Sequence, residues 1–169
     1  MSSEYDLTII GGGPVGMFAA FYAGMRNARV QLLESLPELG GQVQALYPEK
    51  VIHDVAGYPA IKGRELVAQL ETQLKQFPID IQLANPVTDV TGALGDFTVT
   101  TASGQQSHTK AIIVATGSGA FEPRRLAVDN AADFENKQLF YHIPSVEQFR
   151  DRTVLVAGGG DSAIDMALM

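Results

Sequence analysis

The chain has 169 residues, of which 46% are hydrophobic and 18% charged, with a formal net charge of −7 at pH 7 and a pI near 4.8. These values suit one soluble α/β domain with part of a second, and the acidic balance without a basic cluster argues against a nucleic-acid partner. No apolar run is long enough to cross a membrane and no signal-peptide pattern occurs, so we expect a cytoplasmic protein without a membrane partner.

The first predicted unit is a strand, a glycine turn and a helix. The apolar run Leu7–Ile10 is typical of a buried parallel strand. The turn Gly11–Gly16 follows it directly and opens into a predicted helix over Val15–Arg26. A G-x-G-x-x-G turn between a strand and a helix predicts a site for the pyrophosphate of a dinucleotide, because free N–H groups and the positive end of the helix dipole face the anion.

Each glycine of this pattern has a physical role. Gly11 allows the tight exit from the strand, Gly13 lets the backbone approach the phosphates, and Gly16 lets the helix pack closely on the strand. Pro14 suits the first helical position, where its missing N–H costs nothing. The alternative is a structural glycine-rich turn without a ligand.

An acidic residue supports the ligand-binding interpretation. The run Ala28–Leu33 is predicted to be a second strand, and Glu34 ends it. An acid about 20 residues after the turn accepts hydrogen bonds from the ribose hydroxyls of an adenosine and repels a 2′-phosphate. The first site is therefore expected to take FAD or NAD rather than NADP, unless Glu34 is a plain surface acid.

The middle of the chain alternates between loop, helix and strand patterns. A long irregular loop is predicted over Leu36–His53, followed by a helix over Lys62–Gln76 whose apolar stripe packs into the core. Alternating residues at Val87–Thr91 and Phe97–Thr101 predict an antiparallel hairpin, and Ala111–Ala115 predicts another buried strand.

A second glycine unit begins near the end of the sequence. The run Val154–Ala157 is predicted to be a buried strand, and the turn Gly158–Ala163 opens into a helix that stops at Met169 without a capping signal. We expect a domain boundary near Ala120–Arg125, with a first nucleotide-binding domain over residues 1–119. Residues 120–169 are then the truncated beginning of a second nucleotide-binding domain, which indicates a fragment of a longer chain.

Five further segments carry a family resemblance together with the two glycine turns. They are Glu34–Gln42, Ala45–Lys50, His53–Pro59, Ala115–Gly117 and Gly119–Arg124. These segments resemble the ferredoxin–NADP reductases of the thioredoxin-reductase-like type, whose members are about twice as long. The resemblance covers the chain from about Tyr5 to Met169, and the Leu-Tyr-Pro-Glu-Lys and Asp-Val-Ala-Gly stretches are its most specific parts.

The resemblance implies a three-layer, Rossmann-like α/β domain that binds FAD and contains a β-hairpin or meander insertion, followed by the start of an NADPH-binding domain. It implies a flavoenzyme that moves electrons between NADPH, FAD and ferredoxin or a similar small carrier, and a homodimer at full length. Hydride transfer to a flavin requires no side-chain acid or base, so no catalytic residue is assigned.

The resemblance also assigns cofactor contacts. Gln42 would contact the flavin end through its amide, Tyr47 would stack on or border the flavin ring, Val87 would meet the adenine through its backbone, and Phe121 would lie along the cofactor. From the residues alone, a packed loop aromatic is the alternative for Tyr47, and plain hairpin packing is favoured for Val87. For Gln42 and Phe121 the residues alone give no preference. The expected FAD set is Gly11, Gly13, Pro14, Gly16, Glu34, Gly41, Gln42, Tyr47, Val87 and Phe121, and the expected NADPH set is Gly158, Gly160, Asp161, Ser162 and Ala163.

The absence of cysteine separates the competing functions. A thioredoxin reductase or a glutathione-reductase-like enzyme needs a redox pair in this part of the chain, and the sequence contains no cysteine. Its three histidines also lack the spacing of metal ligands, so no metal site is expected. A flavin oxidase, a monooxygenase and a catalytically incomplete FAD-binding fragment remain open alternatives.

Overall fold

The computed structural model describes residues 3–119, 125–141, 143 and 145–168. Its helices and strands follow the order that the sequence predicts for the first domain, with additional short elements. They are β1 (Ser3–Ile10), α1 (Pro14–Gly24), β2 (Val30–Leu33), α2 (Gly41–Leu46), β3 (Val51–Ile52), β4 (Ile61–Lys62), α3 (Gly63–Leu74), β5 (Asp80–Gln82), β6 (Val87–Ala93), β7 (Asp96–Thr101), β8 (Gln106–Val114), α4 (Ala131–Phe134), a 3₁₀ turn (Val146–Phe149) and α5 (Asp161–Leu168).

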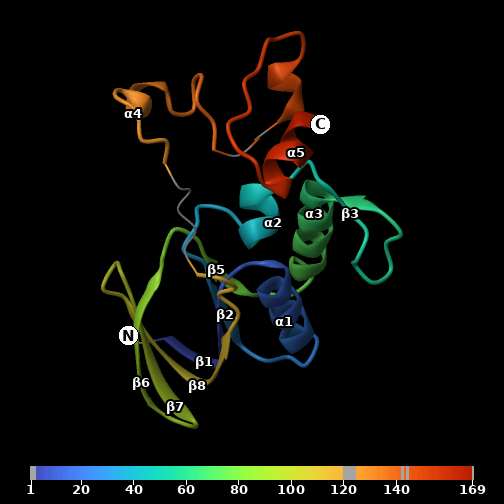
Figure 1. Ribbon diagram of the computed structural model, residues 1–169. Helices are drawn as coiled ribbons and strands as arrows, with labels where there is room; N and C mark the ends of the chain where they lie inside the picture. The colour runs from blue at the N-terminus through green and yellow to red at the C-terminus, as the bar shows by residue number, and fades with distance from the viewer. Residues whose placement is uncertain (1–2, 120–124, 142, 144, 169) are drawn as a thin grey trace.

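One mixed sheet organises the first part of the chain (Figure 1). Its strand order is β5-β2-β1-β8-β7-β6. The strands β5, β2, β1 and β8 run parallel, whereas β6 and β7 form the predicted antiparallel hairpin, which joins the sheet through β8. This Rossmann-like α/β arrangement confirms the predicted fold class.

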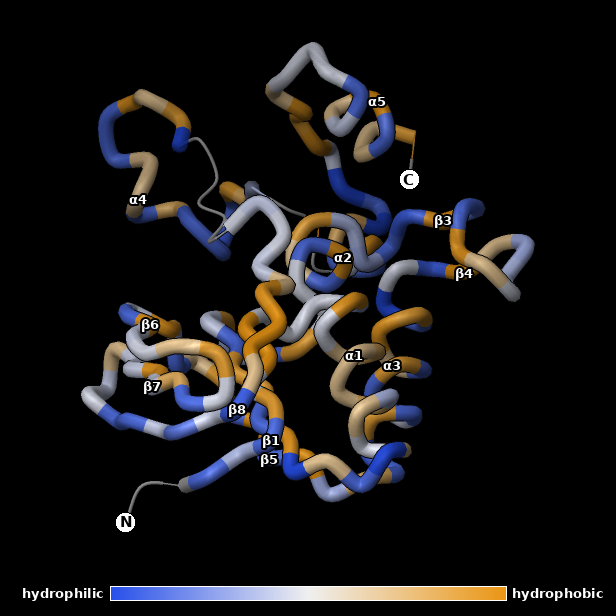
Figure 2. The backbone as a smooth tube through the Cα atoms, turned by 90° about the horizontal axis from the view of Figure 1, so that it is seen from below, coloured by the Kyte–Doolittle hydropathy of each residue, from blue (hydrophilic) through white to orange (hydrophobic). Residues whose placement is uncertain are grey.

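The core lies between the parallel strands and two helices, α1 and α3, which lie side by side on one face of the sheet (Figures 1 and 2). All four residues of β2 are buried, so both faces of the sheet are covered at this strand. On the face away from the helices, the hydroxyls of Thr8 and Ser107 donate hydrogen bonds to Gln31 Oε1 at 3.2 and 2.8 Å. The helix-side core contains Ile9, Met17, Ala20, Val30, Leu32, Leu39, Val67 and Leu74.

Two predictions about local structure need correction. The expected irregular loop at Leu36–His53 contains helix α2 and strand β3. The end of β8 is strand, as predicted, but it is not buried, because Ile113 and Val114 are exposed. Periodicity identifies an apolar segment but not whether another element covers it.

The predicted buried strand at Val154–Ala157 is wrong. These residues form no strand, and Leu155 is 91% exposed. A strand needs a hydrogen-bonded neighbour, and no strand of the described chain lies beside this run. The helix that should follow it is present as α5.

The residues around the expected domain boundary are only partly described, since 120–124 lie outside the described residues. After them come α4, the 3₁₀ turn and α5, which Figure 1 shows beyond the carboxyl ends of the parallel strands. Among the described helices, none combines the length and hydropathy needed to cross a membrane.

Candidate dinucleotide-binding site

The carboxyl ends of three parallel strands bring the first predicted site together. Strand β1 has β2 on one side and β8 on the other, so the connections diverge at β1. Ligands of open α/β sheets bind in the crevice at such a point. The turn Gly11–Gly16 follows β1, Glu34 follows β2, and Ala115–Gly117 follow β8. The Ala115 N–H donates to the Ile10 carbonyl at 2.8 Å, which holds the β1 and β8 exits together.

Two glycines of the turn are required by packing. Gly11 has φ +110°, and a Cβ there would lie 2.4 Å from the Ala115 carbonyl oxygen. A Cβ on Gly16 would lie 1.9 Å from the Gly11 carbonyl oxygen. Neither position accommodates a side chain, because both contacts are with backbone atoms. Pro14 is the first residue of α1, where its fixed φ suits the helix.

Gly13 differs from these two glycines because its surroundings are open. Its φ is −71°, and a Cβ there would meet no atom closer than the Gly41 Cα at 3.9 Å. No side chain of the described residues caps the N-terminus of α1 at Gly13. The fold alone therefore does not explain a glycine here. An anion approaching the amides at the start of α1 does.

Glu34 points inward at the turn rather than into bulk water. It is only 5% exposed. Its Oε2 accepts a hydrogen bond from the Gly12 N–H at 2.6 Å, and its Oε1 accepts from the Leu36 N–H at 2.8 Å and the Ser35 hydroxyl at 3.0 Å. A carboxylate has about four acceptor positions, so these contacts orient it and leave capacity for a ligand hydroxyl.

The start of α2 and the residue before it lie against the glycine turn. The Gly40 N–H donates to the Gly12 carbonyl at 2.9 Å. Gly41 has φ +53°, and a Cβ there would come within 3.0 Å of the Gly13 Cα. The Gln42 amide donates to the Ser118 hydroxyl in the loop after β8. The start of α2 thus spans from the glycine turn to the β8 exit.

Of the three remaining predicted FAD residues, two are described, and they lie on elements that follow Glu34 and Gln42. The Asn85 N–H donates to the Glu34 carbonyl at 3.0 Å, and Val87 begins β6 two residues later. Tyr47 is partly buried at the C-terminal end of α2. Phe121 lies outside the described residues. The structure therefore gathers seven of the expected residues at the carboxyl ends of β1, β2 and β8: Gly11, Gly13, Pro14, Gly16, Glu34, Gly41 and Gln42.

The second glycine turn is separate and exposed. The Gly160 carbonyl accepts hydrogen bonds from Ala163 and Ile164 at 2.9 and 3.3 Å, and α5 begins at Asp161. No atom lies within 4 Å of a Cβ placed on Gly160. Gly158, Gly160, Asp161, Ser162 and Ala163 thus form a turn and a helix start, but they follow no strand.

Sequence reasoning missed two features of this part of the chain. One is the pairing of the Gly12 amide with Glu34, which requires the tertiary contact between β1 and β2. The other is Glu49, which is buried and forms ion pairs with Lys62 and Arg64 at 3.3 and 2.6 Å. The sequence does not indicate that this glutamate is buried, since its partners lie more than ten residues away.

Curated relatives match the whole chain but not their own whole length. The chain is 94% identical over 169 residues to a ferredoxin–NADP reductase of Lactiplantibacillus plantarum, covering 100% of this chain and 51% of that protein. It is 61% identical over 169 residues to one of Levilactobacillus brevis, again covering 51% of that protein. The chain thus spans about half the length of the curated relatives it matches.

A solved structure and a family model agree with the geometry. The thioredoxin reductase of Streptococcus pyogenes superposes with a TM-score of 0.62 at 29% identity, covering 76% of this chain and 39% of that one. Residues 8–169 match the model described as pyridine nucleotide-disulphide oxidoreductase. This match includes both glycine turns, Glu34 and the parallel strands, except for the first residues of β1, Ser3–Leu7. On this evidence the chain belongs to the pyridine nucleotide-disulphide oxidoreductase family.

Proposed function

We propose that the crevice at Gly11–Gly16 binds FAD and that the chain is the flavin-binding part of a ferredoxin–NADP reductase. The observation that carries this proposal is the open space at Gly13, beside an uncapped helix N-terminus and a buried carboxylate bonded to the turn. The names of the two curated relatives described above support the choice of reaction. Residues 1–119 are the FAD-binding domain, and 120–169 begin an NADPH-binding domain.

The residues of the crevice fit the parts of FAD in order. The amides from Gly13 onward at the start of α1 bind the pyrophosphate, and Glu34 accepts hydrogen bonds from the adenosine ribose. The backbone of Val87 borders the adenine. Gly41 and Gln42 lie beside the glycine turn and the β8 exit, toward the flavin end, where Tyr47 borders the ring and Phe121 lies along the cofactor.

The flavin, when bound, supplies the conversion between a two-electron hydride donor and a one-electron carrier. The chain's own residues bind and orient it, so none is assigned as an acid or base. NADPH is held at the second turn by Gly158, Gly160, Asp161, Ser162 and Ala163. The electron acceptor is ferredoxin or a similar small carrier. The protein acts in the cytoplasm and forms a homodimer at full length, without a nucleic-acid or membrane partner.

The experiment that tests this function follows electrons through the flavin. The chain is purified with FAD, reduced anaerobically with NADPH or NADH, and then mixed with ferredoxin, thioredoxin or oxygen. We expect reduction by NADPH in preference to NADH and fastest reoxidation by ferredoxin. Fastest reoxidation by oxygen would favour an oxidase or monooxygenase instead. Flavin binding without reduction by either nucleotide would identify a catalytically incomplete FAD-binding fragment.

A further inference from the structure

The segment Pro48–Lys50, part of the most specific sequence signature, is fastened to the start of α3. Glu49 is buried, and its Oε1 lies 2.6 Å from Arg64 Nη1 while its Oε2 lies 3.3 Å from Lys62 Nζ. The backbone is fixed as well, because the Pro48 carbonyl accepts from the Arg64 N–H at 2.8 Å. The Lys50 carbonyl accepts from the Gly63 N–H at 3.0 Å. This segment is therefore held on both sides of Glu49.

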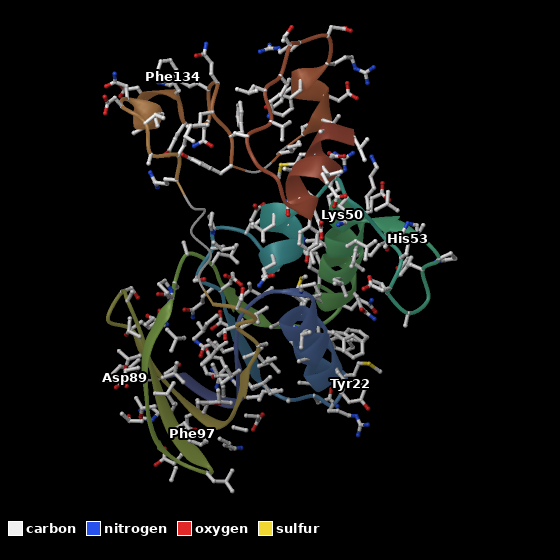
Figure 3. All side chains as sticks on the ribbon, in the orientation of Figure 1. Tyr22, Lys50, His53, Asp89, Phe97 and Phe134 are labelled. Atoms are coloured by element: carbon white, nitrogen blue, oxygen red, sulfur yellow. The ribbon has the colours of Figure 1, made fainter. Side chains whose placement is uncertain are left out.

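Lys50 extends from this fixed segment to the C-terminal helix. Its Nζ lies 2.6 Å from Asp165 Oδ2 in α5, across 115 residues of sequence. Figure 3 labels Lys50 where α5 approaches α2 and α3. The hydrogen bond to Asp165 raises the pKa of Lys50, and the negative charges of Asp165 and Asp161 raise it further. The ion pair therefore favours the charged form of Lys50.

Little apolar burial holds α5 in place. Ile164 and Leu168 are 57% and 81% exposed, and no described residue of this helix is fully buried. The preceding residues 151–160 are all exposed. Since hydrophobic contact contributes little here, a charged contact has a larger share in setting where α5 lies.

We infer that Lys50 is a positioning residue. Glu49 anchors the backbone of Lys50, and the ion pair between Lys50 and Asp165 fixes α5 against the first domain. The glycine turn that precedes α5 is fixed with it. We call the segment Pro48–Lys50 together with Asp165 the clasp. If the second turn holds NADPH, the clasp also determines where NADPH lies. That consequence rests on the proposed function of the second turn, whereas the clasp itself does not.

The size of the effect follows from the exposure of the pair. Lys50 and Asp165 side chains are 49% and 39% exposed. Exposed ion pairs contribute modestly, so removing this one should change the ratio of docked to undocked α5 by roughly two- to fivefold. Salt screens such pairs, and the docked population should fall between low salt and about 1 M salt.

The test measures the position of α5 without any nucleotide. The sequence has no cysteine, so Gln69→Cys in α3 and Ala167→Cys in α5 provide two unique spin-label sites. We expect one dominant label distance in the parent at low salt. We expect a broader distribution in Lys50→Met, recovery in Lys50→Arg, and no further broadening when Asp165→Asn is added to Lys50→Met.

Lys75→Met is the matched control, because Lys75, the residue directly after α3, forms a largely exposed ion pair of 2.8 Å with Glu71 in the last turn of the same helix. It should leave the label distance unchanged. Equal broadening in Lys75→Met, an unchanged distribution in Lys50→Met, or a broad distribution already in the parent at low salt would overturn the clasp. If the label distances behave as expected but the protein fails to bind NADPH, the clasp stands and the proposed role of the second turn is wrong.

Discussion

Gly13 and Gly16 lack side chains for different physical reasons, although they belong to the same turn. A Cβ on Gly16 would collide with backbone, whereas a Cβ on Gly13 has open space around it. We therefore predict that Gly13→Ala folds with unchanged thermal stability but binds FAD at least about tenfold more weakly, because the methyl group occupies the phosphate's approach. Thermal unfolding and fluorescence titration with FAD measure the two quantities.

The matched control is Gly159→Ala in the C-terminal turn. There, too, an added Cβ meets no atom within 4 Å, so neither stability nor FAD affinity should change. Equal FAD affinity in Gly13→Ala and the parent would show that no ligand approaches this amide.

Glu34 is predicted to affect both the fold and the ligand. In Glu34→Gln one carboxylate oxygen becomes an NH₂ group, which leaves either the Gly12 or the Leu36 N–H without its acceptor. We expect the free energy of unfolding to fall by about 1–3 kcal/mol and FAD to bind more weakly. Denaturant unfolding of the flavin-free chain and FAD titration measure both. Glu38→Gln, an exposed acid in the same loop, is the control, and an effect as large there would contradict the special role of Glu34.

At the scale of elements, Gly16 determines how closely α1 approaches the end of β1. A Cβ placed there would lie 1.9 Å from the Gly11 carbonyl oxygen, so Gly16→Ala must displace the helix or the turn. We predict a loss of at least about 3 kcal/mol in the free energy of unfolding, at the upper end for overpacking. Urea unfolding measures it, and a midpoint equal to that of Gly13→Ala would contradict the observed packing.

Glu49 links the end of α2 to the start of α3. Because it is buried beside Arg64, Glu49→Gln should lower the free energy of unfolding by about 1.5–3 kcal/mol. Glu71→Gln removes an ion pair confined to α3 and largely exposed, and its effect should be much smaller. Guanidinium unfolding of the two variants compares them, and equal losses would show that Glu49 is not an anchor.

The elements that the sequence predicts well are those whose signals are local. The strand, turn and helix at Leu7–Gly24, the helix at α3 and the β6–β7 hairpin all follow from apolar period and turn residues. Helix α2 is missed because it is only six residues long and lacks a capping side chain. The run Val154–Ala157 has the local pattern of a strand, but a strand forms only beside a neighbouring strand, and the local pattern does not specify that neighbour.

The residues of the dinucleotide-binding site are likewise predictable only where their signals are local. The spacing of Gly11, Gly13 and Glu34 predicts their meeting at the sheet's edge, because strand ends gather there in any doubly wound fold. The contacts of Gln42 with Ser118 and of Lys50 with Asp165 join residues far apart in sequence. No periodicity or motif encodes such pairs.

At the scale of the whole molecule, the sheet edge and the C-terminal helix are two adjacent places with the features of nucleotide sites. The first has the parallel strands around it, whereas the second has only a turn and α5. FAD should therefore bind to the first place when NADPH is absent, and its binding is independent of α5.

The most direct test of this account is a ¹H–¹⁵N NMR titration of the flavin-free chain with FAD. The amides of Gly12, Gly13, Val15 and Gly16, together with Glu34, should shift in a saturable way at one equivalent, with little change in α5. Shifts confined elsewhere, for example to the groove on α3 lined by Arg64, Val67 and Glu71, would contradict it. So would the absence of any saturable shift at millimolar FAD.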